Sequence, residues 1–573
     1  MNFRYPALIS VALVLAACAQ VPVKTPVADQ ELKPAVAEKS PDLPNIDLNA
    51  ELLYEFLLAE VAGQRGDLRL ATEAYLDLAK TTRDPRVAKR ATEVALFSRL
   101  PQQALESAKL WMDLEPDAAQ PRQAVVALLV STGRLEEARP HLERLIAADE
   151  ANRGQGFLHL NSLLSKQADK KAVLDLTKDL AKPYPQISEA HFAVAQAAWA
   201  AGRQDVALSE IREAAKLRPD WEFAALFQGQ LLQHASSAQA LEFYKGYLRE
   251  YPKAKEVRLA YARFLVNDKQ YVVAREEFRQ LLKEFPDNAE VTLAVGLLSL
   301  QLDDYDLAET YFKQALDLKY KDENAVFQYM GQLNEERKRY DEAILWYGRV
   351  GAGEPFLSAQ IRIAGVLAKQ GKMDDARKHL QQVPVLNNQQ RVQLIQAEAQ
   401  LLRDAKSYRE AFDVLSHGLE KLPNYPDLLY DRAMVAEKID RLDMVEQDLR
   451  KLIQLKPDYA HAYNALGYTL ADRTNRFEEA VKLIEKALKL SPDDPFIMDS
   501  MGWVQYRMGQ HEKAVDYLKR AYDTRPDPEI AVHLGEVLWA QGKHQEAQKV
   551  WQNSLKDNPQ NEALLAVIKK FER

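Results

Sequence analysis

The sequence is poor in cysteine and glycine, and it has no segments typical of β-strands. Cys18 is the single cysteine among 573 residues, and only 21 residues are glycine. A chain that keeps one thiol does not use cysteine for packing, and the scarcity of thiols suits an oxidising compartment. No stretch alternates apolar and polar residues as half-buried strands do. These absences favour an α-helical protein.

A basic surface is also missing. The formal net charge is -8 at pH 7, and the lysines and arginines form no clustered stripe. Because contact with nucleic-acid phosphates requires a basic surface, these features argue against nucleic acid as a partner. The charged fraction of 28% instead suits helices with solvated outer faces.

The motifs of metal- and nucleotide-dependent enzymes are absent as well. The ten histidines include no His-x-x-x-His pair, the spacing that puts two metal ligands on one face of a helix. His511-Glu512 begins like a metalloprotease motif, but Val515 stands in the place of the second histidine. The segment 351–353, Gly-Ala-Gly, lacks the third glycine of a dinucleotide-binding loop, and we interpret it as a turn. We therefore predict no catalytic residue, no metal site and no cofactor.

What the chain does contain is an alanine that recurs every 33 to 35 residues. The phased alanines are Ala71, Ala104, Ala138, Ala172, Ala207, Ala240, Ala274, Ala308, Ala343, Ala376, Ala411, Ala480, Ala514 and Ala547. The interval between Ala411 and Ala480 is two periods long, and Val445 lies at its midpoint. A fixed period in this range is typical of a solenoid, in which each unit buries its apolar face only against its neighbours.

Two further features keep the same phase. Ten of fifteen units have a proline twelve residues after the phased position: Pro116, Pro219, Pro252, Pro286, Pro355, Pro423, Pro457, Pro492, Pro526 and Pro559. Five residues before the phased position stand Gly66, Gly133, Gly202, Gly371, Gly509 and Gly542, or else Asp303, Asp440 and Asn475. Proline ends helices, and Gly, Asp and Asn tolerate the left-handed conformation that closes them. Each unit is therefore predicted to be a helix, a tight turn, a second helix that carries the alanine near its start, and a proline stop.

This unit resembles the tetratricopeptide repeat (TPR). The resemblance is carried by Leu466-Gly467, Phe477, Ala480, Ala487 and Pro492, and by Met501-Gly502, Gly509, Ala514, Ala521 and Pro526. It implies an all-α fold, a right-handed TPR superhelix of about 14 to 15 units over residues 49–560. Residues 561–573 are predicted to form an amphipathic helix that caps the array, with Leu564, Leu565 and Ile568 inward and Lys569, Lys570 and Arg573 outward.

The amino-terminal segment predicts export and lipidation. Residues 7–17 form an apolar run broken only by Ser10, which is too short to span a bilayer but suits a secretory signal. The run ends in Leu15, Ala16, Ala17 and Cys18, and this tetrapeptide resembles the bacterial lipobox. The resemblance implies that residues 1–17 are removed and that Cys18 is lipidated; an ordinary signal peptide with an incidental cysteine is the alternative. Ala19, where inner-membrane lipoproteins tend to have aspartate, implies the periplasmic face of the outer membrane.

Residues 18–48 are predicted to be a tether. They contain Pro22, Pro26, Pro34, Pro41 and Pro44 among valines and charged residues. Such a composition buries too little apolar surface to order itself. The membrane is thus expected to be contacted through the lipid alone, with the array held away from it.

The opening of the array resembles a more specific family. The run from Leu52 to Leu96, in which Leu53, Phe56 and Leu57 share one helical side, is similar to the start of proteobacterial outer-membrane TPR lipoproteins. That resemblance implies an adaptor that binds a periplasmic carboxyl-terminal processing protease and presents peptidoglycan hydrolases for degradation. The alternative is a scaffold of an envelope polysaccharide export or outer-membrane assembly complex.

Partner binding is expected on the face lined by the first helix of each unit. Helical spacing places nine residues toward this groove: Phe192, Trp199, Phe223, Asn464, Tyr468, Trp503, Tyr506, Arg507 and Trp539. Aromatic residues and arginine are enriched among binding hot spots. The alternative, that several of them pack against neighbouring helices, stays open. Asp499 and Val532 occupy positions where a carboxylate clamp for acidic chaperone tails needs other residues, so such tails are not expected as ligands.

Overall fold

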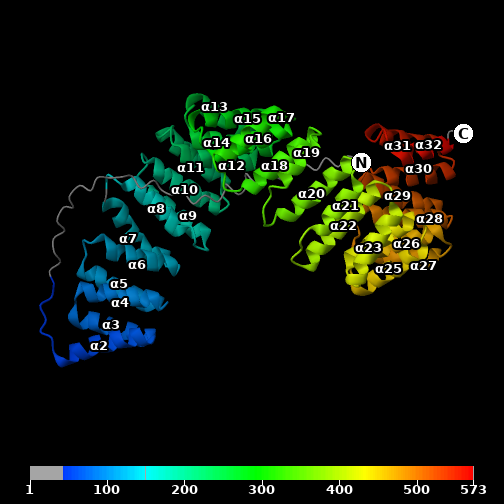
Figure 1. Cartoon of the computed structure of the whole chain (residues 1–573). Coiled ribbons are helices and arrows are strands. Elements are labelled where there is room, and N and C mark those ends of the chain that lie inside the picture. The colour runs from blue at the N-terminus through cyan, green and yellow to red at the C-terminus, as the bar shows by residue number, and fades with distance from the viewer. Residues whose placement is uncertain (1–42, 149, 572–573) are drawn as a thin grey trace. The chain divides into compact units, whose positions relative to one another are not determined.

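A computed structural model describes residues 43–148 and 150–571 of the protein. These residues form repeated pairs of helices (Figure 1). These residues form 31 α-helices and no β-strand, which confirms the predicted all-α solenoid. The first helix begins at Ala50, and Asn49 caps it by accepting a hydrogen bond from the Leu52 amide. None of the described helices combines the length and apolar character that a membrane crossing requires. Leu15, Ala16, Ala17 and Cys18 lie outside the described residues.

The chain divides into two compact units, with the boundary between Tyr320 and Lys321. Unit 1 contains α2(Ala50–Arg65), α3(Leu68–Thr82), α4(Pro85–Phe97), α5(Pro101–Leu114), α6(Ala119–Ser131), α7(Leu135–Ala148), α8(Arg153–Leu164), α9(Lys170–Ala181), α10(Ser188–Ala200), α11(Gln204–Leu217), α12(Glu222–Ala235), α13(Ser237–Glu250), α14(Lys255–Asn267), α15(Tyr271–Glu284), α16(Ala289–Gln301) and α17(Tyr305–Asp317). Unit 2 contains α18(Glu323–Glu336), α19(Tyr340–Tyr347), α20(Phe356–Lys369), α21(Met373–Gln382), α22(Asn388–Asp404), α23(Tyr408–Lys421), α24(Pro426–Lys438), α25(Leu442–Leu455), α26(Ala460–Arg473), α27(Phe477–Leu490), α28(Pro495–Arg507), α29(His511–Thr524), α30(Pro528–Ala540), α31(His544–Asp557) and α32(Glu562–Phe571). Even-numbered helices up to α30 are the first members of their pairs.

The phased alanine lies near the start of every second helix, as predicted. Thirteen of the fourteen alanines, and Val445 in the remaining unit, are fully buried; Ala172 is partly buried. A methyl group at this point lets the two helices of a pair cross closely. The alanine thus recurs with the same period as the contact between the two helices of a pair.

A second contact lies one turn further along the second helix. Tyr347 faces Gly331 of α18, and Leu518 faces Gly502 of α28; a Cβ atom added to either glycine would lie 2.5 Å from the opposing side chain. The same pairing of a small residue with a large one occurs at Gly229, Gly296, Gly467 and Gly535. Each large side chain therefore fills the space that a missing side chain on the first helix leaves.

The turn between paired helices uses the left-handed conformation more widely than its residue types indicate. All six predicted glycines have positive φ, and so do Asp303 and Asp440. The same position is left-handed at Arg99, Lys269, Lys338 and Lys406, where the side chain gives no sign of it. Closure of the helix by hydrogen bonds, as from the Arg339 amide to the Asn334 carbonyl (2.8 Å), holds these residues in place.

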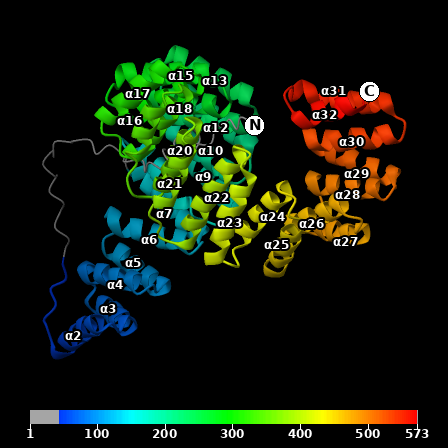
Figure 2. The same cartoon turned by 45° about the vertical axis from the view of Figure 1, so that its right-hand side comes forward.

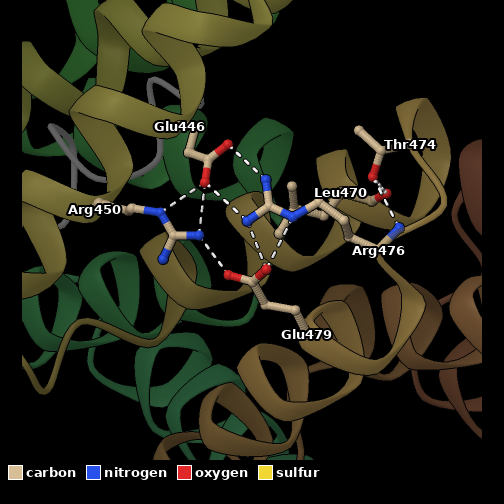
Figure 3. Close-up of polar contacts among 6 residues, drawn as sticks. All are labelled: Glu446, Arg450, Leu470, Thr474, Arg476 and Glu479. Carbon is tan, nitrogen blue, oxygen red and sulfur yellow. Dashed lines mark hydrogen bonds and ion pairs between the residues drawn. The ribbon is translucent and has the colours of Figure 1, made fainter.

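The prediction of this turn at Asn475 is wrong. Helix α26 ends at Arg473 and is capped by Thr474, whose φ of -141° and ψ of -177° are extended. The Thr474 hydroxyl donates to the Leu470 carbonyl (2.5 Å) and accepts from the Arg476 amide (3.1 Å), so a side chain closes the helix in place of a left-handed residue (Figure 3).

The proline stop needs one correction. Nine of the ten phased prolines follow the end of a second helix by two residues, as predicted. Pro355 does not, because α19 already ends at Tyr347 and Pro355 is the N-cap of α20. The intervening segment 351–353 has no helical structure, which confirms its interpretation as a turn.

First helices form the inner side of unit 2. Successive first helices contact one another there, as α26 with α28 and α28 with α30 do, whereas the second helices α25 and α27 pack less closely. Long ionic side chains bridge that wider gap (Figure 3). Arg476 pairs with Glu446 (2.8 Å) and Glu479 (2.6 Å), and Arg450 contacts the same two carboxylates.

The array ends in the predicted capping helix, with one correction. Helix α32 packs beside α30 and α31 (Figure 2). Leu564 is buried and Ile568 is half-buried, but Leu565 is exposed and Val567 takes the inward place, because α32 turns that side toward α30. Lys569 and Lys570 are exposed as predicted, and Arg573 lies outside the described residues.

Candidate functional site: the face of the first helices

All nine predicted groove residues lie on first helices. Phe192 and Trp199 belong to α10 and Phe223 to α12 in unit 1; the other six belong to α26, α28 and α30 in unit 2. The structure thus brings them together as two separate sets, one in each unit.

Part of the set in unit 1 is buried by packing between helices. Phe192 is buried, and its ring lies 4.9 Å from Trp221 and 5.7 Å from Phe227. Trp199 is half-buried, with its ring 4.9 Å from His234. Phe223 is 55% exposed. Phe192 therefore joins α10 to α12, whereas Phe223 and one side of Trp199 remain open to a partner.

The set in unit 2 gathers around a histidine to which the sequence pattern assigned no role. The Nδ1 atom of His533 on α30 lies 3.0 Å from both carboxylate oxygens of Asp499 on α28. The His533 ring stacks on Trp503 at 4.3 Å, and Tyr468 lies 6.1 Å from it. Asp499 and Trp503 are four residues apart and so share one side of α28. His533 follows Asp499 by 34 residues, one period of the repeat, and this spacing is the sequence signal that could have located the pair.

Asp472 extends this cluster toward α26. Its carboxylate accepts a hydrogen bond from the Trp503 indole (3.1 Å), and its carbonyl accepts one from the Arg507 guanidinium (2.6 Å). The Tyr506 ring lies 5.3 Å from Trp503. Four predicted residues, Tyr468, Trp503, Tyr506 and Arg507, are thus held in one network, and Trp503 is buried within it.

Charge and burial oppose each other at His533. Burial by itself lowers the pKa of His533, but the carboxylate of Asp499, followed by those of Glu536 and Glu529, outweighs burial and raises the pKa above its usual value. Burial, with a smaller effect of nearby carboxylates, also raises the pKa of Tyr468. The cluster therefore favours a protonated imidazole paired with Asp499.

Trp539 and Asn464 stand apart from the cluster. The Trp539 ring stacks on His544 at 4.1 Å and lies 5.2 Å from Phe571 of α32, so it serves the packing of the terminal repeats. The Oδ1 atom of Asn464 is buried without a hydrogen-bond partner in the described part of the chain. Among the nine predicted groove residues, this oxygen is the atom to which a ligand would donate a hydrogen bond.

Sequence reasoning missed a polar groove on the same face of unit 2. It has a volume of about 770 Å³ and lies along α20 and α22, with Asp431 of α24 at its edge. Five glutamines of α22 line it: Gln389, Gln390, Gln393, Gln396 and Gln400. The glutamines belong to one helix and do not recur with the period of the repeat, which is why the groove escaped prediction.

The first helix of the array has an uncovered apolar side. Helix α2 buries Leu52, Ala59 and Ala62 but exposes larger residues. These are Leu53 (43% exposed), Tyr54 (65%), Phe56 (45%), Leu57 (51%) and Val61 (43%). An ordinary surface helix buries its large apolar residues, so this inverted pattern indicates a contact surface.

The surfaces described above consist of aromatic, amide and charged side chains. No three or more His, Cys, Asp or Glu side chains in residues 43–148 and 150–571 are grouped so that they could hold a metal ion. Aromatic rings, amides and isolated ion pairs on a long helical face are the chemistry of protein recognition.

A helical-repeat protein with its polar and aromatic residues on the inner helices is a protein-binding solenoid. The tetratricopeptide repeat family models match residues 231–298, 293–355, 458–527 and 500–565. The TPR repeat-containing protein PA4667 of Pseudomonas aeruginosa is 39% identical over 537 residues, covering 92% of this chain and 90% of that protein. The chain belongs to the tetratricopeptide repeat family, whose domains bind protein partners.

Other similarities have lower sequence identity. The small glutamine-rich tetratricopeptide repeat-containing protein 2 of Mycosarcoma maydis is 30% identical over 122 residues, which cover 21% of this chain and 32% of that protein. Among solved structures, the thermophilic TPR protein TTC0263 of Thermus thermophilus is 22% identical, covers 31% of this chain and 96% of its own, and has a TM-score of 0.29. The APC/C hetero-tetramer Cut9-Hcn1 is 13% identical, covers 85% of this chain and 97% of the matched chain, and has a TM-score of 0.28.

Proposed function

We propose that the protein is an outer-membrane lipoprotein adaptor that faces the periplasm. It binds a carboxyl-terminal processing protease and presents peptidoglycan hydrolases to it, without an enzymatic activity of its own. The lipobox that ends at Cys18, followed by repeats along nearly the whole chain, supports the anchored scaffold. The resemblance of the run Leu52–Leu96 to adaptor lipoproteins supports the choice of partner.

The observation that carries the proposal is the uncovered apolar side of α2. Soluble proteins rarely leave several large apolar side chains together in water unless a partner covers them. Leu53 and Leu57 are one helical turn apart on this side, within the segment that resembles the adaptor family. We assign the side of α2 to the protease, because a docking surface at one end leaves the inner faces of later repeats for the substrate.

The mechanism is an increase in effective concentration. A protease and a hydrolase held on one scaffold meet as an intramolecular pair, so cleavage no longer waits for their diffusional encounter. The lipid anchor confines both to the membrane surface, where hydrolases act on the cell wall. No chemical step is required of the adaptor itself.

The test is binding of the purified full chain to the processing protease, by pull-down and by interferometry. The variant Leu53→Asp/Leu57→Asp places charges on the apolar side and is expected to weaken binding by about tenfold or more, since each buried leucine is worth roughly 1.5–3 kcal/mol. Leu345→Asp is the matched control, because Leu345 is 69% exposed on α19. Far-UV circular dichroism checks that both variants keep their helices.

Two results would contradict the adaptor. One is unchanged protease binding by the variant Leu53→Asp/Leu57→Asp, a result that would rule out the side of α2 as the docking surface. The other is native co-purification of export or barrel-assembly components in the absence of any processing protease. Hydrolases that do not accumulate when the gene is deleted would argue in the same direction.

A further inference from the structure

The groove of unit 2 is lined chiefly by side-chain amides. Helix α22 is 17 residues long and places Gln389, Gln393, Gln396 and Gln400 at intervals of four, three and four residues. That spacing puts all four on one side of the helix. The opposite wall is α20, with Leu357, Ser358 and Ile361.

Much of the hydrogen-bonding capacity of these amides is unused. Gln389 and Gln393 are exposed, and no hydrogen bond joins their side chains to another described residue. Gln396 donates to Asp431 (2.7 Å), whereas Gln400 is paired at both ends: it donates to Asp404 (2.6 Å) and accepts from Arg403. The amides of Gln389 and Gln393 and the oxygen of Gln396 therefore present donors and acceptors to a ligand.

We propose that this groove binds an extended polypeptide segment of a partner protein through the main chain of that segment. Each peptide unit carries one N–H donor and one C=O acceptor, and a glutamine amide offers both complements. Along a helix with a rise of 1.5 Å per residue, the glutamines four residues apart are separated by about 6 Å and those three apart by about 4.5 Å. The longer separation is close to the roughly 6.6 Å between alternate residues of an extended chain. The whole run, about 16 Å long, matches about five extended residues.

Charge and ring content favour a polypeptide of mixed sequence over other ligands. The groove has the carboxylates of Glu354 and Asp431 and the guanidinium of Arg403, so no single sign of charge dominates it. None of its lining residues is aromatic, and a sugar chain thus finds no ring on which to stack. Leu386, 90% exposed beside Asn387 at the groove, adds an apolar contact for one side chain of the segment.

This site adds a place for the substrate to the proposed adaptor role. The identity of the segment in the groove, an unfolded stretch of a hydrolase, rests on that proposed role. Recognition through the main chain tolerates different side chains, so one groove accepts several substrates. Protease docking on α2 needs no groove, and peptide binding in the groove needs no protease. The two proposals can therefore fail independently.

The experiment is fluorescence polarisation with the full chain and a labelled peptide of about ten residues, in which serine alternates with threonine, a residue that favours the extended conformation. A second peptide carries N-methyl groups on alternate main-chain amides. We expect saturable binding of the first peptide, and binding about fivefold or more weaker for the N-methylated one, because hydrogen bonds between the main chain and the groove are lost.

The variant Gln389→Ala/Gln393→Ala is expected to weaken binding of the unmodified peptide by about fivefold or more for the same reason. Gln382→Ala is the matched control, because Gln382 is an exposed glutamine at the end of the second helix α21. Equal unfolding temperatures for the variants show that folding is unchanged.

Three results would overturn the proposal: no saturable peptide binding, equal affinity for the N-methylated peptide, or equal affinity of Gln389→Ala/Gln393→Ala. Binding of an N-acetylglucosamine oligomer in place of the peptide would assign the groove to glycan instead. Loss of peptide binding with protease binding intact in Gln389→Ala/Gln393→Ala supports the groove as a separate site.

Discussion

At the scale of the residue, the repeat depends on alternating small and large side chains. The phased alanine allows the paired helices to cross, and the glycine of the first helix receives the large residue one turn beyond that alanine. In the pair α18 and α19, Gly331 receives Tyr347, which is buried. The small residues are retained because they create space at the contact, although glycine weakens a helix.

The substitution Gly331→Ala separates these two effects. A methyl group there meets the Tyr347 ring at 2.5 Å. We expect a net destabilisation of about 1–2 kcal/mol, because overpacking outweighs the gain of roughly 1 kcal/mol in helix propensity. Gly365→Ala on α20 is the control, since its methyl group meets no atom within 4 Å and should stabilise the protein. Denaturant titration followed by circular dichroism measures both, and stabilisation by Gly331→Ala would contradict the packing role.

At the scale of the element, charged side chains join helices of successive pairs in two different ways. On the outer side, Arg450 and Arg476 bridge α25 and α27 through partly exposed ion pairs. On the inner side, His533 and Asp499 join α30 to α28 in a nearly buried pair, with side chains 14% and 10% exposed. Solvent screens the outer contacts, whereas the inner pair is sensitive to its protonation.

The inner pair predicts a pH dependence of stability. Because the folded-state pKa of His533 is raised, its contribution is fully present below the unfolded value of about 6.5 and is lost as pH rises through the folded pKa. The thermal midpoint of the wild-type chain should therefore fall over this window, and that of His533→Gln should fall less. In Asp499→Asn, burial of an unpaired histidine lowers its pKa and reverses the sign. A common slope in all three chains would refute the pairing.

At the scale of the whole molecule, the described residues form two compact units built from one type of helix pair. Each pair buries its apolar side mainly against the adjacent pairs, so the array gains length without needing a larger core. Binding surfaces can then be distributed along the chain, as we propose for the side of α2 and the groove of α22. The lipid anchor that we propose at Cys18 would hold all of these surfaces at one membrane.

Lipidation provides a prediction for the whole chain. Cys18→Ser should abolish incorporation of labelled palmitate and move the protein from the membrane to the soluble fraction, because no other segment is expected to hold it there. Ala19→Asp is the matched control, which should stay lipidated but fractionate with the inner membrane. Membrane association of Cys18→Ser at the wild-type level would contradict the lipobox assignment.

The sequence by itself determined the class of fold and the phase of the repeat. Alanine, proline and glycine act locally, at helix crossings and helix ends, so their spacing reports the helices directly. That is why the second helices begin where the phased alanines predict. Where different residues can close a helix equally well, the sequence pattern did not predict which one does. Thr474 closes α26 in place of the expected turn at Asn475, and Lys338 adopts the left-handed conformation without being a glycine.

Only the tertiary structure decided which side chains are available. Phe192, Trp503 and Phe223 are equivalent choices on a helical projection, yet the first two are buried between helices and the third is exposed. The pairing of His533 with Asp499 and the outward side of α2 likewise depend on how successive pairs pack. Burial is a property of neighbours that lie far apart in the chain, and helical periodicity within one element contains no information about them.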